Sequence, residues 1–88
     1  MIEREATIVN QEGLHARPAA RIVRLASAFT AEIELAKDGL AVNGKSIMGV
    51  MMLAAECGSS IIIRADGPDA DAAVQALAEL VASGFGEQ

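Results

Sequence analysis

The alternation of apolar and polar positions along the chain predicts four strands. Within the second of them, Ile33 and Leu35 alternate with charged residues, which is the period of a half-buried strand. Asp38-Gly39 is a strong hairpin signal and turns this strand back into the third. The predicted strands are EREATIV (residues 3–9), AEIELAK (31–37), LAVN (40–43) and SSIIIRAD (59–66).

Apolar residues spaced three or four positions apart predict helices between these strands. The first helix begins at Ala16 and continues to about Ala28. The second is IMGVMMLAAEC (residues 47–57), with Ser46 as its N-cap and Gly58 closing it.

A third helix follows the last strand. It starts with Pro68 at the first helical position, places Asp69 and Asp71 at the positive end of the helix dipole, and ends at Gly84. The element order β-α-β-β-α-β-α predicts an antiparallel or mixed sheet with helices on one face. The pattern alone fits a ferredoxin-like arrangement and other two-layer folds of the same order.

Composition narrows the class of protein. The 88 residues are enough for one small domain, covering residues 1–88, and the net charge of −5 argues against nucleic-acid binding. The lone Cys57 cannot form an internal disulfide, which favours a reducing compartment. The start, MIEREATIV, lacks the apolar stretch of a signal peptide, and IMGVMMLAA is too short to span a membrane. We therefore expect a cytoplasmic protein with no direct membrane insertion.

The single histidine, His15, lies in GLHARPAA (residues 13–20), where the first helix is predicted to begin. The free backbone donors nearest an N-cap here are those of Ala16 and Arg17, because Pro18 brings no N–H. The helix dipole and Arg17 favour an anion and disfavour an imidazolium, which leaves a neutral, nucleophilic ring. The residues therefore suit a phosphohistidine carrier that needs no metal or cofactor. The alternative is an ordinary helix cap.

Residues 39–46, GLAVNGKS, raise a second interpretation from a different class. They formally match the G-x-x-x-x-G-K-S pattern of a nucleotide-binding phosphate loop. Such a loop needs small residues whose N–H groups converge, whereas Leu40, Ala41 and Val42 fit the return strand of the hairpin better. We therefore rank nucleotide binding behind the phosphocarrier interpretation.

GLHARP, an apolar helix after it, and GKSIMGVMMLAA (residues 44–55) together resemble HPr, the phosphocarrier family of the phosphoenolpyruvate-dependent phosphotransferase system. The likeness extends over essentially the whole chain. It implies an α+β fold, an open-faced β-sandwich with a four-stranded antiparallel sheet and three helices on one face. It also implies that His15 carries the phosphoryl group on Nδ1 and that Arg17 stabilises it. The donor would be enzyme I and the acceptor an EIIA-type protein.

The second helix has no polar face, so part of it is expected to stay exposed as a docking surface. Methionine suits a surface that meets several partners in turn. The alternative is complete burial against the sheet. The residues expected in the core are Val50, Leu53 and Ala54. The residues expected to dock partners are Ile47, Met48 and Met51, with Ala20 and Arg24 of the first helix; Arg17, Arg21 and Arg24 form a basic stripe that could steer an acidic partner or simply face solvent.

Ser46 has two compatible roles, as a helix N-cap and, by the resemblance, as a site phosphorylated by HPr kinase/phosphorylase. A regulatory binding module that acts through Ser46 and the Met48/Met51 patch without phosphoryl transfer is therefore an alternative function. One departure from the family is Glu12, where relatives often carry a small neutral residue; we expect it to point to solvent. We also expect a monomer.

Overall fold

The computed structural model describes residues 1–87, which form the predicted order of elements with one added turn of 3-10 helix, η1. The strands are β1 (Ile2–Thr7), β2 (Glu32–Lys37), β3 (Leu40–Asn43) and β4 (Ser60–Asp66). The helices are α1 (Ala16–Ala26), α2 (Ile47–Met52), α3 (Ala70–Ala82) and η1 (Gly84–Gly86).

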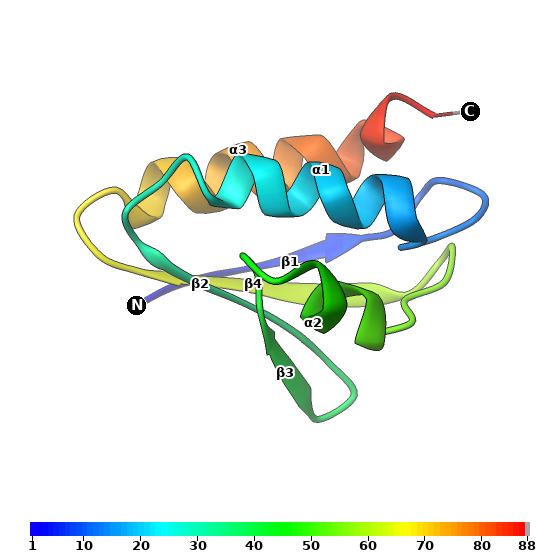
Figure 1. Cartoon of the computed structure of the whole chain (residues 1–88), viewed down its shortest axis with the longest axis horizontal. Helices are drawn as coiled ribbons and strands as arrows, with labels where there is room; N and C mark the ends of the chain where they lie inside the picture. The colour runs from blue at the N-terminus through cyan, green and yellow to red at the C-terminus, as the bar shows by residue number, and fades with distance from the viewer. Residues whose placement is uncertain (88) are drawn as a thin grey trace.

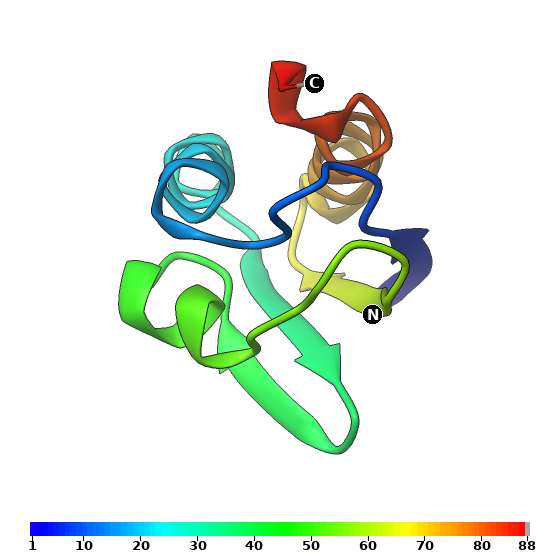
Figure 2. The ribbon, with the colours of Figure 1, turned by 90° about the vertical axis from the view of Figure 1, so that its right-hand side faces the viewer.

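The four strands form one antiparallel sheet in the order β1-β4-β2-β3. α1 and α3 lie side by side across one face, and α2 covers the same side next to β3 (Figures 1 and 2). This arrangement confirms the four-stranded antiparallel sheet with three helices on one face. It also places the start of α1, the end of α3 and the loop before β4 at one end of the molecule (Figure 1).

Alternate residues of the sheet supply the core. Leu35 of β2 lies opposite Ile63 of β4, and both are buried beneath the helices. The helices add Ile22 and Leu77, each 1% exposed. Burial of such side chains contributes about 1.5–3 kcal/mol each, so this apolar layer holds the helices on the sheet.

The other face of the sheet is polar and carries an ion-pair ladder. Arg64 lies directly opposite Glu3 of β1 and Glu34 of β2 in the strand register. Its Nε is 2.7 Å from Glu3 Oε2 and its Nη1 is 3.0 Å from Glu34 Oε1. The two carboxylates raise the pKa of the Arg64 guanidinium above its ordinary value. One cation therefore joins three strands on the open face.

The second helix is shorter than predicted. α2 ends at Met52 rather than at residue 57, because Ala54 adopts a left-handed conformation with φ of 49°. The chain then turns so that the carbonyl of Ala55 accepts a 2.9 Å hydrogen bond from Leu14 N. Tertiary contact with the loop before α1 thus outweighs the helical pattern of LAAEC. Gly58 does not close the helix; its N–H donates to Ile8 O at 2.7 Å.

The start of the third helix also differs from the prediction. Its N-cap is Asp69, and Pro68 lies in the preceding turn rather than at the first helical position. The Asp69 carboxylate accepts hydrogen bonds from the amides of Thr30 at 2.9 Å and Ala31 at 2.8 Å. These bonds, that from Thr30 foremost, lower the pKa of Asp69 below its ordinary value. This aspartate therefore fastens the end of α1 to the start of β2, whereas Asp71 lies in the first turn of α3 as expected.

Candidate functional site

The loop before α1 presents His15 at the helix N-terminus. His15 is the N-cap, with extended backbone (φ −82°, ψ −168°), and its side chain makes no capping hydrogen bond. The backbone N–H groups of Ala16 and Arg17 belong to the first turn, where an α-helix offers no internal acceptor. Pro18 is buried at the third helical position. The predicted placement is confirmed, and the ring and these donors lie together at the positive end of the helix.

A close approach of two loops holds His15 in place. Gly13 adopts φ of 71°, and a Cβ built there would lie only 2.4 Å from the carbonyl oxygen of Ala55. The next residue, Leu14, is buried and donates its N–H to that same carbonyl at 2.9 Å. Only glycine fits this position without a backbone shift. The residues after α2 therefore support the loop that carries the histidine.

The His15 ring faces two carboxylates. Its side chain is 33% exposed, and Nε2 lies 3.3 Å from Glu87 Oε2 and 4.0 Å from Glu12 Oε1. Glu12 is 77% exposed, as expected for a solvent-facing side chain, yet it remains near the ring. The sequence analysis did not identify Glu87, which is brought from the far end of the chain. Neither did it identify Asn10, a 3% exposed residue whose Nδ2 donates to Glu87 Oε1 at 3.2 Å.

The Glu87 carboxyl is held in its ionised form. Burial alone would raise the pKa of this carboxyl. The hydrogen bonds with His15 and Asn10 outweigh burial, and together with the charges of His15 and Arg17 they bring the pKa of the Glu87 carboxyl below its ordinary value. A negative charge therefore lies beside Nε2, on a ring that the helix dipole alone would keep neutral.

The basic stripe on α1 is present. The side chains of Arg17, Arg21 and Arg24 are all exposed. The guanidinium of Arg21 lies next to Gly86, where a built Cβ would be 3.5 Å from Nη1. Arg17 is close enough to Glu87 for its charge to act on that carboxyl. The stripe thus runs from the His15 site along the outer side of the helix.

Ser46 begins α2 as its N-cap. Its backbone is extended, and its Oγ accepts a hydrogen bond from Gly49 N at 3.1 Å. The predicted cap is confirmed. This hydroxyl lies at the surface edge of the molecule and is intermediate in exposure.

α2 divides its residues between the core and the surface. Val50 is fully buried and Leu53 is 5% exposed, as predicted, whereas Ala54 is exposed because it lies in the turn after the helix. The exposed apolar residues are Ile47 at 42%, Met48 at 71%, Met51 at 42% and Met52 at 64%. The predicted exposed patch is confirmed, and the structure adds Met52. α1 and α2 are in contact, and Ala20 is half-buried on α1.

Comparison with known proteins identifies the family. The family model described as "PTS HPr component phosphorylation site" matches residues 2–83. The phosphocarrier protein HPr of Cupriavidus necator is 47% identical over 87 residues, which cover 99% of this chain and 98% of that protein. A crystal structure of HPr from Thermoanaerobacter tengcongensis superposes with a TM-score of 0.96 at 45% identity, covering 100% and 99% of the two chains.

The chain belongs to the HPr family. It is thus a member of the phosphocarrier family of the phosphotransferase system, whose proteins interact with enzymes of that system such as enzyme I and EIIA. The comparisons also match the HPr-like protein Crh of Halalkalibacterium halodurans, 47% identical over 77 residues, or 88% of this chain and 92% of that protein. The resemblance of GLHARP and GKSIMG to HPr is confirmed.

The HPr fold removes the basis for the nucleotide-binding interpretation. Leu40–Asn43 form β3 rather than a loop around a phosphate. Gly44 packs against Ile33, whose carbonyl accepts its N–H at 2.8 Å. The amine of Lys45 donates to Phe29 O at 2.8 Å. The G-x-x-x-x-G-K-S match therefore has none of the converging donors of a phosphate cradle.

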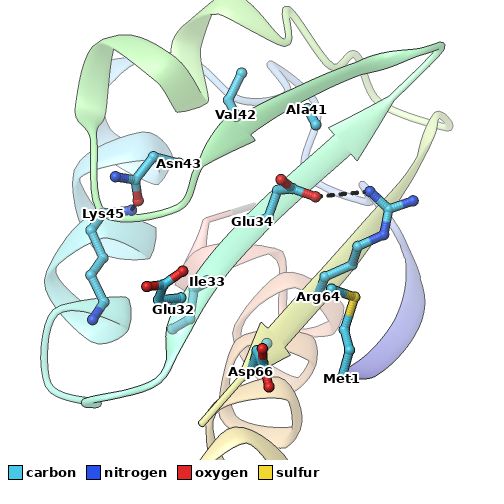
Figure 3. A pocket seen from close by; sticks show the side chains of 11 residues that line it. Met1, Glu32, Ile33, Glu34, Ala41, Val42, Asn43, Lys45, Arg64 and Asp66 are labelled. Atoms are coloured by element: carbon cyan, nitrogen blue, oxygen red, sulfur yellow. Dashed lines mark hydrogen bonds and ion pairs between the residues drawn. The ribbon is translucent and has the colours of Figure 1, made fainter.

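The main hollow of this HPr protein is not near His15. It lies beside the ends of β2, β3 and β4 and is lined by carboxylates and by the cations Lys45 and Arg64, with Arg64 already paired to Glu34 (Figure 3). Within residues 1–87, no group of three His, Cys, Asp or Glu side chains could hold a metal ion. No helix in the described part of the chain is long and apolar enough to cross a membrane.

Proposed function

We propose that this HPr protein accepts a phosphoryl group on His15 from phosphorylated enzyme I and passes it to an EIIA-type protein. The observation that carries the proposal is the free His15 ring at the N-terminus of α1. A side chain that made the usual capping bond would not be available, whereas this imidazole is partly exposed and unused by its own helix.

The transfer needs a nucleophile and a place for the phosphoryl oxygens. The lone pair of His15 Nδ1 attacks phosphorus, and the bond from phosphorus to the donor histidine breaks with its electron pair returning to the donor ring. The N–H groups of Ala16 and Arg17 and the guanidinium of Arg17 then accept charge–dipole and ionic contacts from the oxygens. The phosphoryl group leaves again when a histidine of the acceptor attacks it.

The exposed patch on α2 supports docking of these partners. Ile47, Met48 and Met51 lie on the surface beside Ala20 and Arg24 of the neighbouring helix, and all are proposed contact residues. Apolar side chains that unbranched methionine dominates can fit several partners. The basic stripe of α1 would draw an acidic partner toward His15.

Ser46 is proposed as a regulatory phosphorylation site for an HPr kinase/phosphorylase. Its position at a helix N-terminus accommodates a phosphate electrostatically, so the fold should persist. The two added charges would lie next to Ile47 and Met48 and would weaken docking of an acidic or apolar partner surface. A regulatory module that uses Ser46 and the Met48/Met51 patch without transfer is the second candidate, supported by the likeness to Crh.

The proposal includes a single HPr-type domain over residues 1–88, acting as a monomer in the cytoplasm. Carrier and regulator are separated by mixing the protein with phosphoenolpyruvate and enzyme I without ATP and recording intact mass. We expect one acid-labile phosphoryl group on the wild type and on Ser46→Ala, and none on His15→Ala. An unmodified wild type with a cognate, active enzyme I would overturn the carrier proposal. An acid-stable phosphate on Ser46 with ATP and kinase would then support the regulator.

A further inference from the structure

The segment after α3 is built to reach a fixed place. Gly84, Phe85 and Gly86 all have positive φ values, of 68°, 59° and 74°. Glycine adopts this conformation freely, but phenylalanine does so only at a cost in free energy. Phe85 is fully buried, and its burial offsets that cost. The left-handed turn is therefore anchored by a core side chain rather than left loose at the end of the helix.

This turn directs Glu87 back to the start of α1. The backbone N–H of Glu87 donates to Gly84 O at 2.9 Å. Its carboxylate is 22% exposed and lies 3.3 Å from Nε2 of His15. Figure 1 shows the C-terminal segment above the same end of the molecule as the start of α1.

Asn10 holds the carboxylate from the other side. This buried amide uses Nδ2 twice, donating to Gly13 O at 2.8 Å and to Glu87 Oε1 at 3.2 Å. Because the same amide nitrogen also bonds the backbone two residues before His15, it ties the position of Glu87 to the loop that carries the histidine. The carboxylate and the ring are therefore positioned relative to each other by buried groups.

We propose that Glu87 is a positioning residue for phosphoryl transfer: it holds the proton of His15 on Nε2 and leaves the lone pair on Nδ1. The inference rests on the proposed transfer at His15. A carboxylate can only accept, so a ring nitrogen facing it must carry hydrogen. In a neutral imidazole the other nitrogen is then the nucleophile.

The same contact acts on the phosphorylated state. When Nδ1 bonds to phosphorus and the donor's P–N bond breaks, Nε2 keeps its proton and the ring becomes cationic. Glu87 stabilises that cation. When the acceptor takes the phosphoryl group, the electron pair of the P–N bond returns to Nδ1 and His15 leaves as a neutral ring. The charged groups around the ring are Glu87, Glu12 and Arg17, and Glu12 is farther away and mostly exposed.

The test is a spectroscopic one on the whole protein, with ring-labelled ¹⁵N-histidine at a pH where the imidazole is neutral. We expect the wild type to show a protonated Nε2 and an unprotonated Nδ1. Glu87→Ala should shift both resonances toward a mixture of tautomers. Glu87→Gln, which keeps an acceptor oxygen, should restore much of the wild-type pattern. Glu12→Gln is the matched control and should leave it unchanged.

The rate of phosphoryl acceptance from phosphorylated enzyme I is measured on the same variants. We expect it to fall roughly threefold to tenfold in Glu87→Ala, the size expected for one hydrogen bond to a charged group. An unchanged ¹⁵N pattern in Glu87→Ala would overturn the inference, even if the rate fell. A wild type that accepts no phosphoryl group would overturn the proposed function instead, because the tautomer pattern is read without transfer.

Discussion

Two helix N-termini in this protein have opposite designs. α1 begins after His15, whose side chain caps nothing, and α2 begins after Ser46, whose hydroxyl accepts the N–H of Gly49. Both cap residues have extended backbone, so local conformation does not distinguish them. The difference is that α2 satisfies a first-turn donor with its own residue, whereas α1 leaves its donors beside a reactive ring. A cap that is poor for the helix is thus available for chemistry.

Their surroundings differ in the same sense. His15 faces Glu87 and Glu12, which act on the charge of the ring. Ser46 is followed by the exposed side chains of Ile47 and Met48, which offer contact area rather than charge. One N-terminus is therefore suited to carry a group and the other to sense one at a docking surface.

Breaking the support of the first N-terminus has the largest expected effect. In Gly13→Ala, the new Cβ meets the backbone oxygen of Ala55 and φ is unfavourable, so we expect a loss of about 2–4 kcal/mol in the free energy of unfolding. Gly39→Ala is the control, since φ is also positive but nothing lies within 4 Å, and it should cost about 1 kcal/mol. Equal losses in urea denaturation would show that the contact with Ala55 does not matter.

Removing the cation next to His15 sharpens the assignment of roles. Arg17→Ala should reduce the rate of phosphoryl acceptance roughly tenfold, which corresponds to one charge-assisted hydrogen bond. Arg24→Ala, farther along the same exposed stripe, should change the rate far less and raise its dependence on salt only slightly. Single-turnover kinetics with phosphorylated enzyme I measures both. Similar losses in the two variants would mean that the stripe acts only by general attraction.

Exchanging each cap residue for alanine tests the comparison directly. Ser46→Ala should lower the free energy of unfolding by about 1 kcal/mol, because Gly49 N loses its acceptor. His15→Ala should change it by less than about 0.5 kcal/mol, since no capping bond is lost. Thermal or urea unfolding at neutral pH provides the measurement. A larger loss for His15→Ala would contradict the open design of the first N-terminus.

The smallest expected effect is a pH dependence from Glu87. Its pKa is lower in the folded chain than the ordinary value, so its stabilising contribution is complete above that ordinary value. The contribution is lost as pH falls through the lowered pKa and the carboxylate is protonated. The difference in melting temperature between wild type and Glu87→Gln should therefore shrink on acidification. A difference that is constant with pH would mean that the contact is not ionic.

Local patterns predicted most of the fold because the decisive signals are local. The Asp38-Gly39 hairpin, the Ser46 cap and the apolar centre of β4 all appear where expected. The end of α2 could not be predicted, since the bond from Leu14 N to Ala55 O joins segments far apart in the sequence.

The site was predicted in part for the same reason. His15 and its helix N-terminus follow from neighbouring residues, but Glu87 reaches the ring only through the turn at Phe85 and the buried amide of Asn10. A large apolar residue between two glycines after a helix is a sign of an anchored turn. Nothing local indicates where that turn leads. Asp69 is a similar case, since its carboxylate bonds Thr30 and Ala31 rather than the helix that it begins.

The pairing of β1 with β4 determines when this protein can fold during its synthesis. β1 lies at the edge of the sheet and its neighbour is β4, made from residues 60–66. A growing chain on the ribosome can form the β2–β3 hairpin early, but its first strand must wait for a partner that is synthesised last among the strands. Nascent chains that stop before Ser60 should therefore hold a hairpin and no sheet. Because β4 pairs on both sides, its arrival completes the molecule in one late event.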